Sequence, residues 1–343
     1  MKFLNISMLA GVLLFAACDK TLEEKQVTFD VSSTKIDGQA SDTFTEKDTI
    51  VYQFNGNAEV VTFYSGIVGQ RYEFKDRITA KGIPQLTFST IRATGAQANS
   101  LQLLVSSDFK GVVAKSKTVQ GVVTQDTAAT MSNIAVANWT NISTRATWST
   151  GATAAVSSGV IDLSDFDKGV PVFIAFKYLA TAGATQNKWT ISALSLNNVL
   201  PDNTVYTQAN FAAPNQSITN YGVNTPGLGW LSTFDEGLNK NRYRWVYSSG
   251  IGAAGTLVIT GATSAGAATA GAEAWAILGP IDLRKVSPDA GLPIKDVNKL
   301  MKSYADATGY TEGKYKVTFV ASNNTVNGTS DVVRQLPIAI TKP

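Results

Sequence analysis

Apolar and polar residues alternate with a period of two near both ends of the chain. The alternation covers residues 27–31, 49–54, 60–66, 314–323 and 332–341. Asp-Gly at 37–38 and Asn-Gly at 55–56 separate the early runs, and such dipeptides favour tight turns between antiparallel strands. The pattern therefore predicts short antiparallel strands at both ends.

The middle of the chain carries longer mixed runs of apolar residues that Gly, Asp and Asn interrupt or separate. They occupy residues 101–111, 158–166, 170–180, 188–199 and 272–283. Runs of this kind are typical of β-strands. Residues 294–307 differ, because they space Val297, Leu300, Met301 and Tyr304 at intervals of three and four. That spacing predicts a helix, the only one expected in an otherwise all-β chain.

The first residues have the composition of a secretory leader. Lys2 is followed by a mostly apolar stretch up to Phe15, and Ala16-Ala17 precede Cys18. The stretch is too short to cross about 30 Å of hydrocarbon as a helix. Residues 15–18 resemble the lipobox of bacterial lipoproteins, which implies that residues 1–17 are removed and that Cys18 becomes lipidated. The alternative is an ordinary signal peptide with an incidental cysteine.

The mature chain begins with a polar segment that lacks a strand period. Residues 18–26 are predicted to be the lipidated cysteine and a flexible tether. Acidic residues soon after such a cysteine resemble the surface-export signals of Bacteroidota lipoproteins, although any charged tether looks similar. The resemblance implies an outer-membrane protein, anchored by lipid and facing the cell exterior.

Composition excludes several kinds of chemistry. The chain has no histidine, which removes the commonest general base and zinc ligand. Cys18 is the only cysteine, so no intramolecular disulfide can form. The formal net charge is +3 without a basic block, which argues against nucleic acid as a partner.

Both ends of the chain resemble parts of a PKD-type, immunoglobulin-like sandwich. Residues 54–57 (FNGN) and 63–66 (FYSG) look like its early strands, and the C-terminal runs look like its closing hairpin. The runs between them resemble a jelly-roll sandwich related to galactose-binding-like modules. We therefore expect residues 27–83 with 309–343 to form one sandwich, split in sequence, and residues 84–308 to form an inserted jelly roll.

Taken together, the lipobox and segments such as VTFYSG, SGVIDLSDF and AEAWAILGPIDL resemble a Bacteroidota lipoprotein family whose domain has no known function. Such proteins commonly accompany SusC/SusD-type outer-membrane pairs that import glycans. The resemblance implies these proteins and a polysaccharide or oligosaccharide as partners. It brings no catalytic residues.

Aromatic side chains are the better candidates for a binding site, because sugars stack their C–H faces on flat rings. Trp230 follows Pro226, Gly227 and Gly229 in an irregular segment, so its ring is either a ligand platform or a plug over the core. Trp148 is expected at a strand end. Trp139, Trp189 and Trp275 lie in apolar runs and are expected in the core.

The segment NRYRWVYSSG supplies three further candidates. Tyr243 and Trp245 alternate with Arg242 and Arg244, which gives one aromatic and one basic face. We therefore add Tyr243, Arg244 and Trp245 to the glycan-binding candidates. A half-buried strand explains the same pattern.

Acidic residues are candidates for catalytic groups and for metal ligands. Asp162 with Asp165, or Asp235 with Glu236, could form the carboxylate pair of a glycoside hydrolase, but each lies where Asp commonly caps a turn. The sequence calls for no cofactor. Oxygen-rich turns could hold a structural calcium ion, although no DxDxDG loop is present.

The sequence as a whole favours a non-catalytic protein that captures an extracellular polysaccharide beside an uptake complex. A structural or adhesive surface protein that binds another protein is the alternative. A carboxylate-based glycoside hydrolase is a weaker one.

Overall fold

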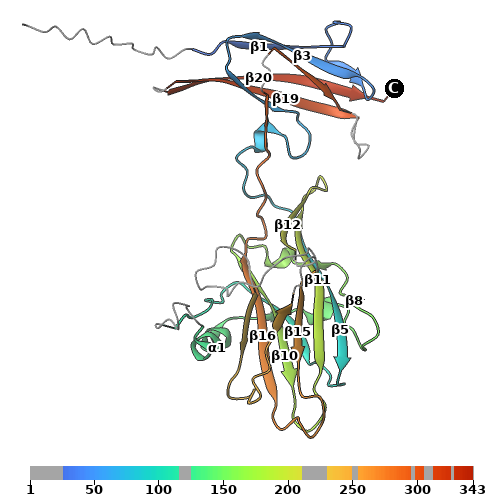
Figure 1. Cartoon of the computed structure of the whole chain (residues 1–343), viewed down its shortest axis with the longest axis vertical. Helices are drawn as coiled ribbons and strands as arrows, with labels where there is room; N and C mark the ends of the chain where they lie inside the picture. The colour runs from blue at the N-terminus through green and yellow to red at the C-terminus, as the bar shows by residue number, and fades with distance from the viewer. Residues whose placement is uncertain are drawn as a thin grey trace, which may run out of the picture. The chain divides into compact units, whose positions relative to one another are not determined.

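The computed structural model describes residues 26–115, 125–210, 230–248, 254–294, 298–304, 312–325 and 328–342. The chain is all-β, as predicted, and its strands form several sandwich-like sheets (Figure 1). It divides into two compact units. The terminal unit comprises the residues up to Asp76 and those from Pro288 onward, and the central unit comprises Arg77–Ser287.

The terminal unit packs a three-stranded sheet against a five-stranded one. The strand orders are β1-β3-β18 and β17-β4-β19-β20-β2. Its elements are β1 (Phe29–Thr34), β2 (Thr43–Thr45), β3 (Thr49–Gly56), β4 (Val60–Tyr64), η1 (Tyr72–Phe74), β17 (Leu292–Ile294), β18 (Lys299–Ser303), β19 (Gly313–Thr325) and β20 (Gly328–Thr341). Phe319 lies at the centre of the core, with its ring 5.2 Å from those of Tyr52 and Phe63. The two ends of the chain therefore share one core.

The central unit is a second sandwich. The β10 sheet has the order β13-β16-β10-β6-β7, and the β11 sheet has the order β14-β15-β11-β5-β8, with β12 paired to β11 and β9 to β5. The elements are β5 (Ile83–Thr94), β6 (Leu101–Ser106), α1 (Thr127–Val136), β7 (Thr140–Asn141), η2 (Ser143–Arg145), β8 (Val156–Ser157), β9 (Ile161–Asp162), η3 (Ser164–Phe166), β10 (Val172–Ala180), β11 (Lys188–Val199), β12 (Val205–Asn210), β13 (Trp230–Phe234), β14 (Val246–Ser248), β15 (Thr256–Thr260) and β16 (Ala272–Ile281).

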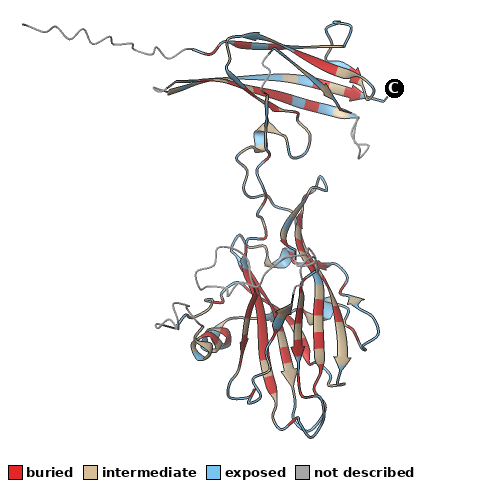
Figure 2. Ribbon diagram, viewed as in Figure 1, coloured by how far each residue is buried: buried red, intermediate tan, exposed pale blue. Residues whose placement is uncertain are grey.

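The main core of the central unit lies between these two sheets. Leu86, Phe88 and Ile191 of the β11 sheet pack with residues such as Ile174 and Phe176 of the β10 sheet. Buried and less buried positions alternate along β5 and β11, as Figure 2 shows. The period-two pattern of the sequence thus corresponds to one face of the β11 sheet turned toward this core.

The opposite face of the β10 sheet carries a smaller core. Leu104, Phe173, Trp275 and Ile277 point to this side and pack with Ile134 of α1. The β10 sheet is therefore covered on both faces, which explains why β10 and β16 read as nearly continuous apolar runs.

The helix predicted over residues 294–307 is wrong for residues 294 and 298–304, whereas residues 295–297 and 305–307 of the predicted span lie outside the described residues. Lys299–Ser303 form β18, which pairs antiparallel with β3 and places Leu300 opposite Tyr52. Leu300 packs on the core and Tyr304 is buried, whereas Met301 is exposed. The buried positions therefore follow the period of two of a strand. The pairing also places residues 298–304 in the terminal unit instead of the inserted domain, whose boundaries lie at 77 and 287 instead of 84 and 308.

Helix α1, which lies in the described part of the chain, was not predicted. Asp126 caps its N-terminus by accepting a hydrogen bond from the Ala129 backbone N–H at 2.9 Å. Only Thr130 and Ile134 of this helix are buried, so the helix carries little apolar periodicity for a sequence pattern to detect.

Candidate functional site

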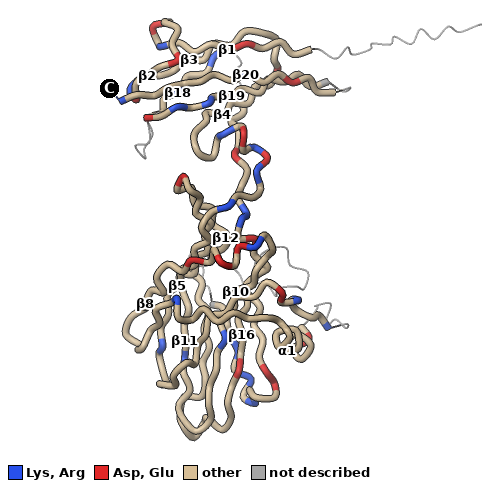
Figure 3. Tube along the Cα trace, turned by 180° about the vertical axis from the view of Figure 1, so that it is seen from behind, with Lys and Arg blue, Asp and Glu red and all other residues tan. Residues whose placement is uncertain are grey.

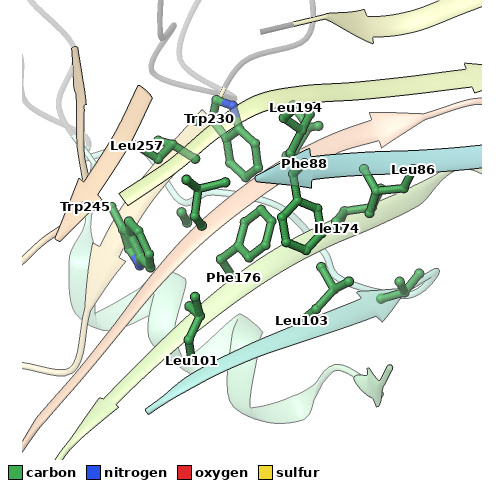
Figure 4. Packing of buried hydrophobic residues seen from close by; sticks show 14 of the residues in the cluster. Leu86, Phe88, Leu101, Leu103, Ile174, Phe176, Leu194, Trp230, Trp245 and Leu257 are labelled. Carbon is green, nitrogen blue, oxygen red and sulfur yellow. The ribbon is translucent and has the colours of Figure 1, made fainter. Parts of the chain in front are cut away.

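Trp230 and Trp245 lie in the core and are not exposed platforms. Their side chains retain 1% and 2% of their accessible surface. Figure 4 shows both among the buried residues between the sheets, and the ring of Trp230 lies 5.8 Å from that of Phe176. Strand β13, which Trp230 begins, pairs with β16 and directs the indole inward. The prediction that Trp230 and Trp245 contact a glycan is therefore wrong, because both indoles are buried in the core.

The neighbours of Trp245 are divided between core and surface. Tyr243 is partly buried and packs against the core, while Arg244 is exposed. The aromatic side of this segment therefore faces inward, as the half-buried alternative predicts. The other proposed functional residue, Cys18, lies outside the described residues, as do Pro226, Gly227 and Gly229.

Trp148 lies in the wall of an open pocket of about 370 Å³ in the central unit, which we call the Trp148 pocket. Three segments form it: the end of β5 with the loop to β6, residues 143–150, and the start of β11. Its lining residues are Arg92, Gln97, Ala98, Asn99, Ser100, Leu101, Ser143, Thr144, Ala146, Trp148, Ser149, Thr150 and Trp189. Two indoles, two amides and five hydroxyl side chains thus surround one cavity.

Packing and hydrogen bonding hold the Trp148 indole in place. Its Nε1 donates to the Ser143 carbonyl oxygen at 2.9 Å, and its ring lies 5.5 Å from Phe88 and 6.4 Å from Trp189. The side chain nevertheless remains only partly buried. A fixed and partly exposed ring loses little conformational entropy on stacking against a ligand.

A buried polar network supports the floor of this pocket. The Ser100 hydroxyl oxygen accepts hydrogen bonds from Trp189 Nε1 at 2.9 Å and from Asn187 Nδ2. Asn187 Oδ1 accepts from the Gln97 backbone N–H at 3.0 Å. Asn187 is fully buried, so these bonds hold the loop of residues 95–100 against the start of β11.

Gly95 lets that loop approach Asn187 closely. Its φ of +70° is unfavourable for residues with a side chain, and an added Cβ would lie 2.7 Å from the Asn187 backbone nitrogen. The loop is therefore shaped for tight contact with the start of β11, which brings Gln97 and Asn99 to the pocket.

The lining carries one charged side chain. Arg92 is the register partner of Trp189 across β5 and β11, and its guanidinium donates to the Thr150 carbonyl oxygen. Four of the other polar side chains in the lining bond to protein groups: Gln97, Ser100, Ser143 and Ser149. The side chains of Asn99, Thr144 and Thr150 are exposed, and their amide and hydroxyl groups can both donate and accept hydrogen bonds. Such a lining suits an uncharged, hydroxyl-rich ligand, and Arg92 also tolerates an anionic one.

Sequence reasoning found one of the two pocket indoles. Trp189 was expected in the core; it is indeed 4% exposed, yet it also lines the pocket. Arg92, Gln97 and Asn99 were not predicted. The polar, turn-forming segment TGAQANS at 94–100 was the sequence signal for Gln97 and Asn99. Its proximity to Trp148, however, follows from strand pairing.

The carboxylates considered for hydrolysis have structural partners. Asp162 Oδ1 accepts from the Ser164 backbone N–H at 2.7 Å, and both Asp165 oxygens accept from the Arg145 guanidinium. These bonds hold the pKa of the Asp165 carboxyl below its usual value, whereas a general acid needs a raised one. Asp235 Oδ1 accepts from the backbone N–H groups of Gly237 and Leu238, and Glu236 pairs with Arg242.

Three further observations concern the described part of the chain. No three His, Cys, Asp or Glu side chains there gather closely enough to hold a metal ion. No helix there has the length and apolar character needed to span a membrane. Basic and acidic residues are interspersed in both units (Figure 3).

Comparison with known proteins places the chain in a family. Residues 17–215 match DUF5017, described as a domain of unknown function. The chain belongs to the DUF5017 family. The matched region includes the whole lining of the Trp148 pocket. No curated protein and no solved structure matches the chain.

Proposed function

We propose that this DUF5017 protein binds an extracellular polysaccharide without cleaving it, and that the Trp148 pocket is the binding site. The observation that carries the proposal is the partly exposed indole of Trp148 in a pocket rimmed by amide and hydroxyl side chains. An indole face accepts the C–H face of a sugar ring, and the rim groups exchange hydrogen bonds with its hydroxyls.

The cellular setting is part of the same proposal. A lipid on Cys18 would anchor the chain to the outer membrane, facing the exterior. The resemblance to Bacteroidota lipoproteins supports a role beside a SusC/SusD-type uptake pair. A shallow pocket gives modest affinity for one sugar segment, but many anchored copies on one surface raise the effective concentration for a polymer.

Affinity electrophoresis tests the proposal. The full chain, in a detergent without a sugar head group, is run through native gels cast with xyloglucan, galactomannan, arabinoxylan, laminarin, dextran or polygalacturonate. We expect retardation by at least one class, and Trp148→Ala should weaken it. Trp148→Phe, which keeps a smaller ring, should retain part of it.

Tyr206→Ala provides the matched control. Tyr206 is a partly exposed aromatic residue of β12 in the same unit, and β12 pairs with β11 at residues 195–199, away from Trp189. Its loss should leave the retardation unchanged. If no glycan slows the wild-type chain, the proposal fails and a protein-binding role becomes the next one to test. Reducing-sugar release that stops on replacing one Asp or Glu would favour a hydrolase.

A further inference from the structure

A second pocket lies on the opposite face of the β10 sheet, where α1 covers it in part. It has a volume of about 560 Å³, and we call it the Trp139 pocket. It is lined by Leu104, Met131, Ser132, Ile134, Ala135, Ala137, Trp139, Lys177, Asp235, Glu273 and Trp275. We propose that it is a second sugar-binding site, specific for uncharged sugar units. The inference rests on the proposed function and extends it.

Two indoles form the aromatic part of the Trp139 pocket. The rings of Trp139 and Trp275 lie 5.3 Å apart, and Trp139 also packs 5.6 Å from Phe109. Trp139 Nε1 donates to the Ile134 carbonyl oxygen at 3.1 Å. Trp275 is buried, but Trp139 is only partly so. The structure thus holds one indole rigidly with part of its surface open, as it does for Trp148.

The segment before Trp139 is also fixed. Asp108 accepts from the Asn138 backbone N–H at 2.8 Å and from Asn138 Nδ2 at 2.6 Å. A hydrogen bond from Ser106 Oγ, together with these two bonds from Asn138, holds the pKa of the Asp108 carboxyl below its usual value. The Trp139 ring is therefore positioned before any ligand arrives.

The charged groups decide which ligand fits. Glu273 Oε1 accepts from Trp275 Nε1 at 2.8 Å, and Glu273 Oε2 pairs with Lys177 Nζ at 3.1 Å. The Lys177 ammonium also lies 4.9 Å from the centre of the Trp275 ring. Lys177 thus already occupies the positions that a ligand cation would take, so a cationic ligand is disfavoured.

Anionic ligands are disfavoured as well. Asp235 and Glu273 give the lining two carboxylates against one lysine. Carboxylate oxygens accept hydrogen bonds from hydroxyl groups, and an open indole stacks on the C–H face of a sugar ring. An uncharged sugar satisfies both features. The Trp148 pocket differs in its charge, because its one charged side chain is the positive Arg92.

One segment joins the two pockets. Residues 139–150 supply Trp139 to one pocket and Trp148 to the other, and the span between these two Cα atoms cannot exceed about 30 Å. A single extended polysaccharide of several sugar units covers such a distance. Two sites on one unit would then bind a polymer more tightly than either alone.

Affinity electrophoresis of the full chain, with the same polysaccharides and detergent, tests the second site. We expect Trp139→Ala to weaken retardation by a neutral glycan about fivefold or more, and Trp139→Ala combined with Trp148→Ala to abolish it. Ala135→Leu should weaken it without touching an indole, because Ala135 is exposed on α1 and lines the pocket. Val136→Leu, at the next exposed position outside the lining, is the matched control.

The outcomes separate the two proposals. If Trp139→Ala and Ala135→Leu, verified as folded by thermal unfolding, bind like wild type while Trp148→Ala loses binding, the second site is refuted and the proposed function stands. If Trp148→Ala binds like wild type while the Trp139 pocket variants lose binding, the second site is supported and the Trp148 pocket is not the site. Absence of retardation of the wild-type chain by every glycan would contradict both.

Discussion

Trp148 and Trp230 stand in similar sequences but in opposite environments. Each has a Ser-Thr pair within three residues and a glycine nearby: Trp148 is followed by Ser-Thr-Gly, and Trp230 follows Gly229 and precedes Leu-Ser-Thr. Trp230 begins a strand whose inner face meets Phe176 and whose outer face is covered, since Leu231 joins the core beneath α1. Trp148 lies outside any strand, beside a loop that leaves part of its ring open. The environment of a tryptophan here depends on which layers cover it, and local composition does not reveal that.

This difference predicts the largest effect on stability at Trp230. Trp230→Ala removes a fully buried indole between two sheets and should lower the free energy of unfolding by about 3 to 5 kcal/mol. Urea denaturation followed by far-UV circular dichroism measures the change. A loss below about 1 kcal/mol would mean that Trp230 is not a core residue.

The second largest loss of stability is expected in the hydrogen-bond network under the Trp148 pocket. Ser100→Ala leaves the Trp189 and Asn187 donors without their acceptor in a buried position, which should cost about 1 to 3 kcal/mol of folding free energy. Glycan retardation should weaken as well, because the loop that carries Gln97 and Asn99 loses its support. Unchanged stability and retardation would show that the network does not fix the loop.

A smaller effect, confined to binding, is expected at the pocket rim. Asn99 is exposed and has a φ of +53°, a conformation that glycine adopts freely. Asn99→Gly therefore removes the amide group without straining the backbone. We expect a severalfold loss of glycan affinity by isothermal titration with the retarding polysaccharide, and no loss of thermal stability. Stability and affinity falling together would indicate a structural role for Asn99.

The smallest effect concerns pH. Because hydrogen bonds from Arg145 lower the pKa of Asp165 in the folded state, this pair stabilises the protein above the unfolded pKa of about 3.9 and loses that contribution as pH falls through the folded value. Both side chains are substantially exposed, at 37% and 51%, so the effect is weak. Urea midpoints between pH 6 and 3 should fall slightly less steeply for Asp165→Asn than for wild type. If the urea midpoints of the two proteins fall with pH at the same rate, the Arg145–Asp165 pair does not contribute to stability.

The sequence predicted the strands better than the site. Strands such as β3, β10 and β19 were found because period-two alternation and long apolar runs record burial directly. The spacing of Leu300 and Tyr304 fits both a helix and a strand, and pairing with β3 decides for the strand. Helix α1 was missed because it buries only two residues.

The candidate site depends on contacts between distant residues. Arg92 and Trp189 meet through the register of β5 and β11, and the Ser100 hydroxyl meets Trp189 across a similar sequence distance. No local pattern encodes such contacts. The exposure of Trp148 and the burial of Trp230 and Trp245 follow likewise from how the two sheets and α1 pack.

The most direct test compares wild type and Trp148→Ala in the same gels, cast with increasing amounts of the polysaccharide that retards the wild-type chain most. A stacking contact contributes about 0.5 to 1.5 kcal/mol beyond the apolar area that it buries, so we expect the apparent dissociation constant to rise about tenfold. The thermal unfolding midpoint of the variant confirms that it is folded. Equal retardation of a folded Trp148→Ala variant and the wild type would contradict the assignment of glycan binding to this pocket.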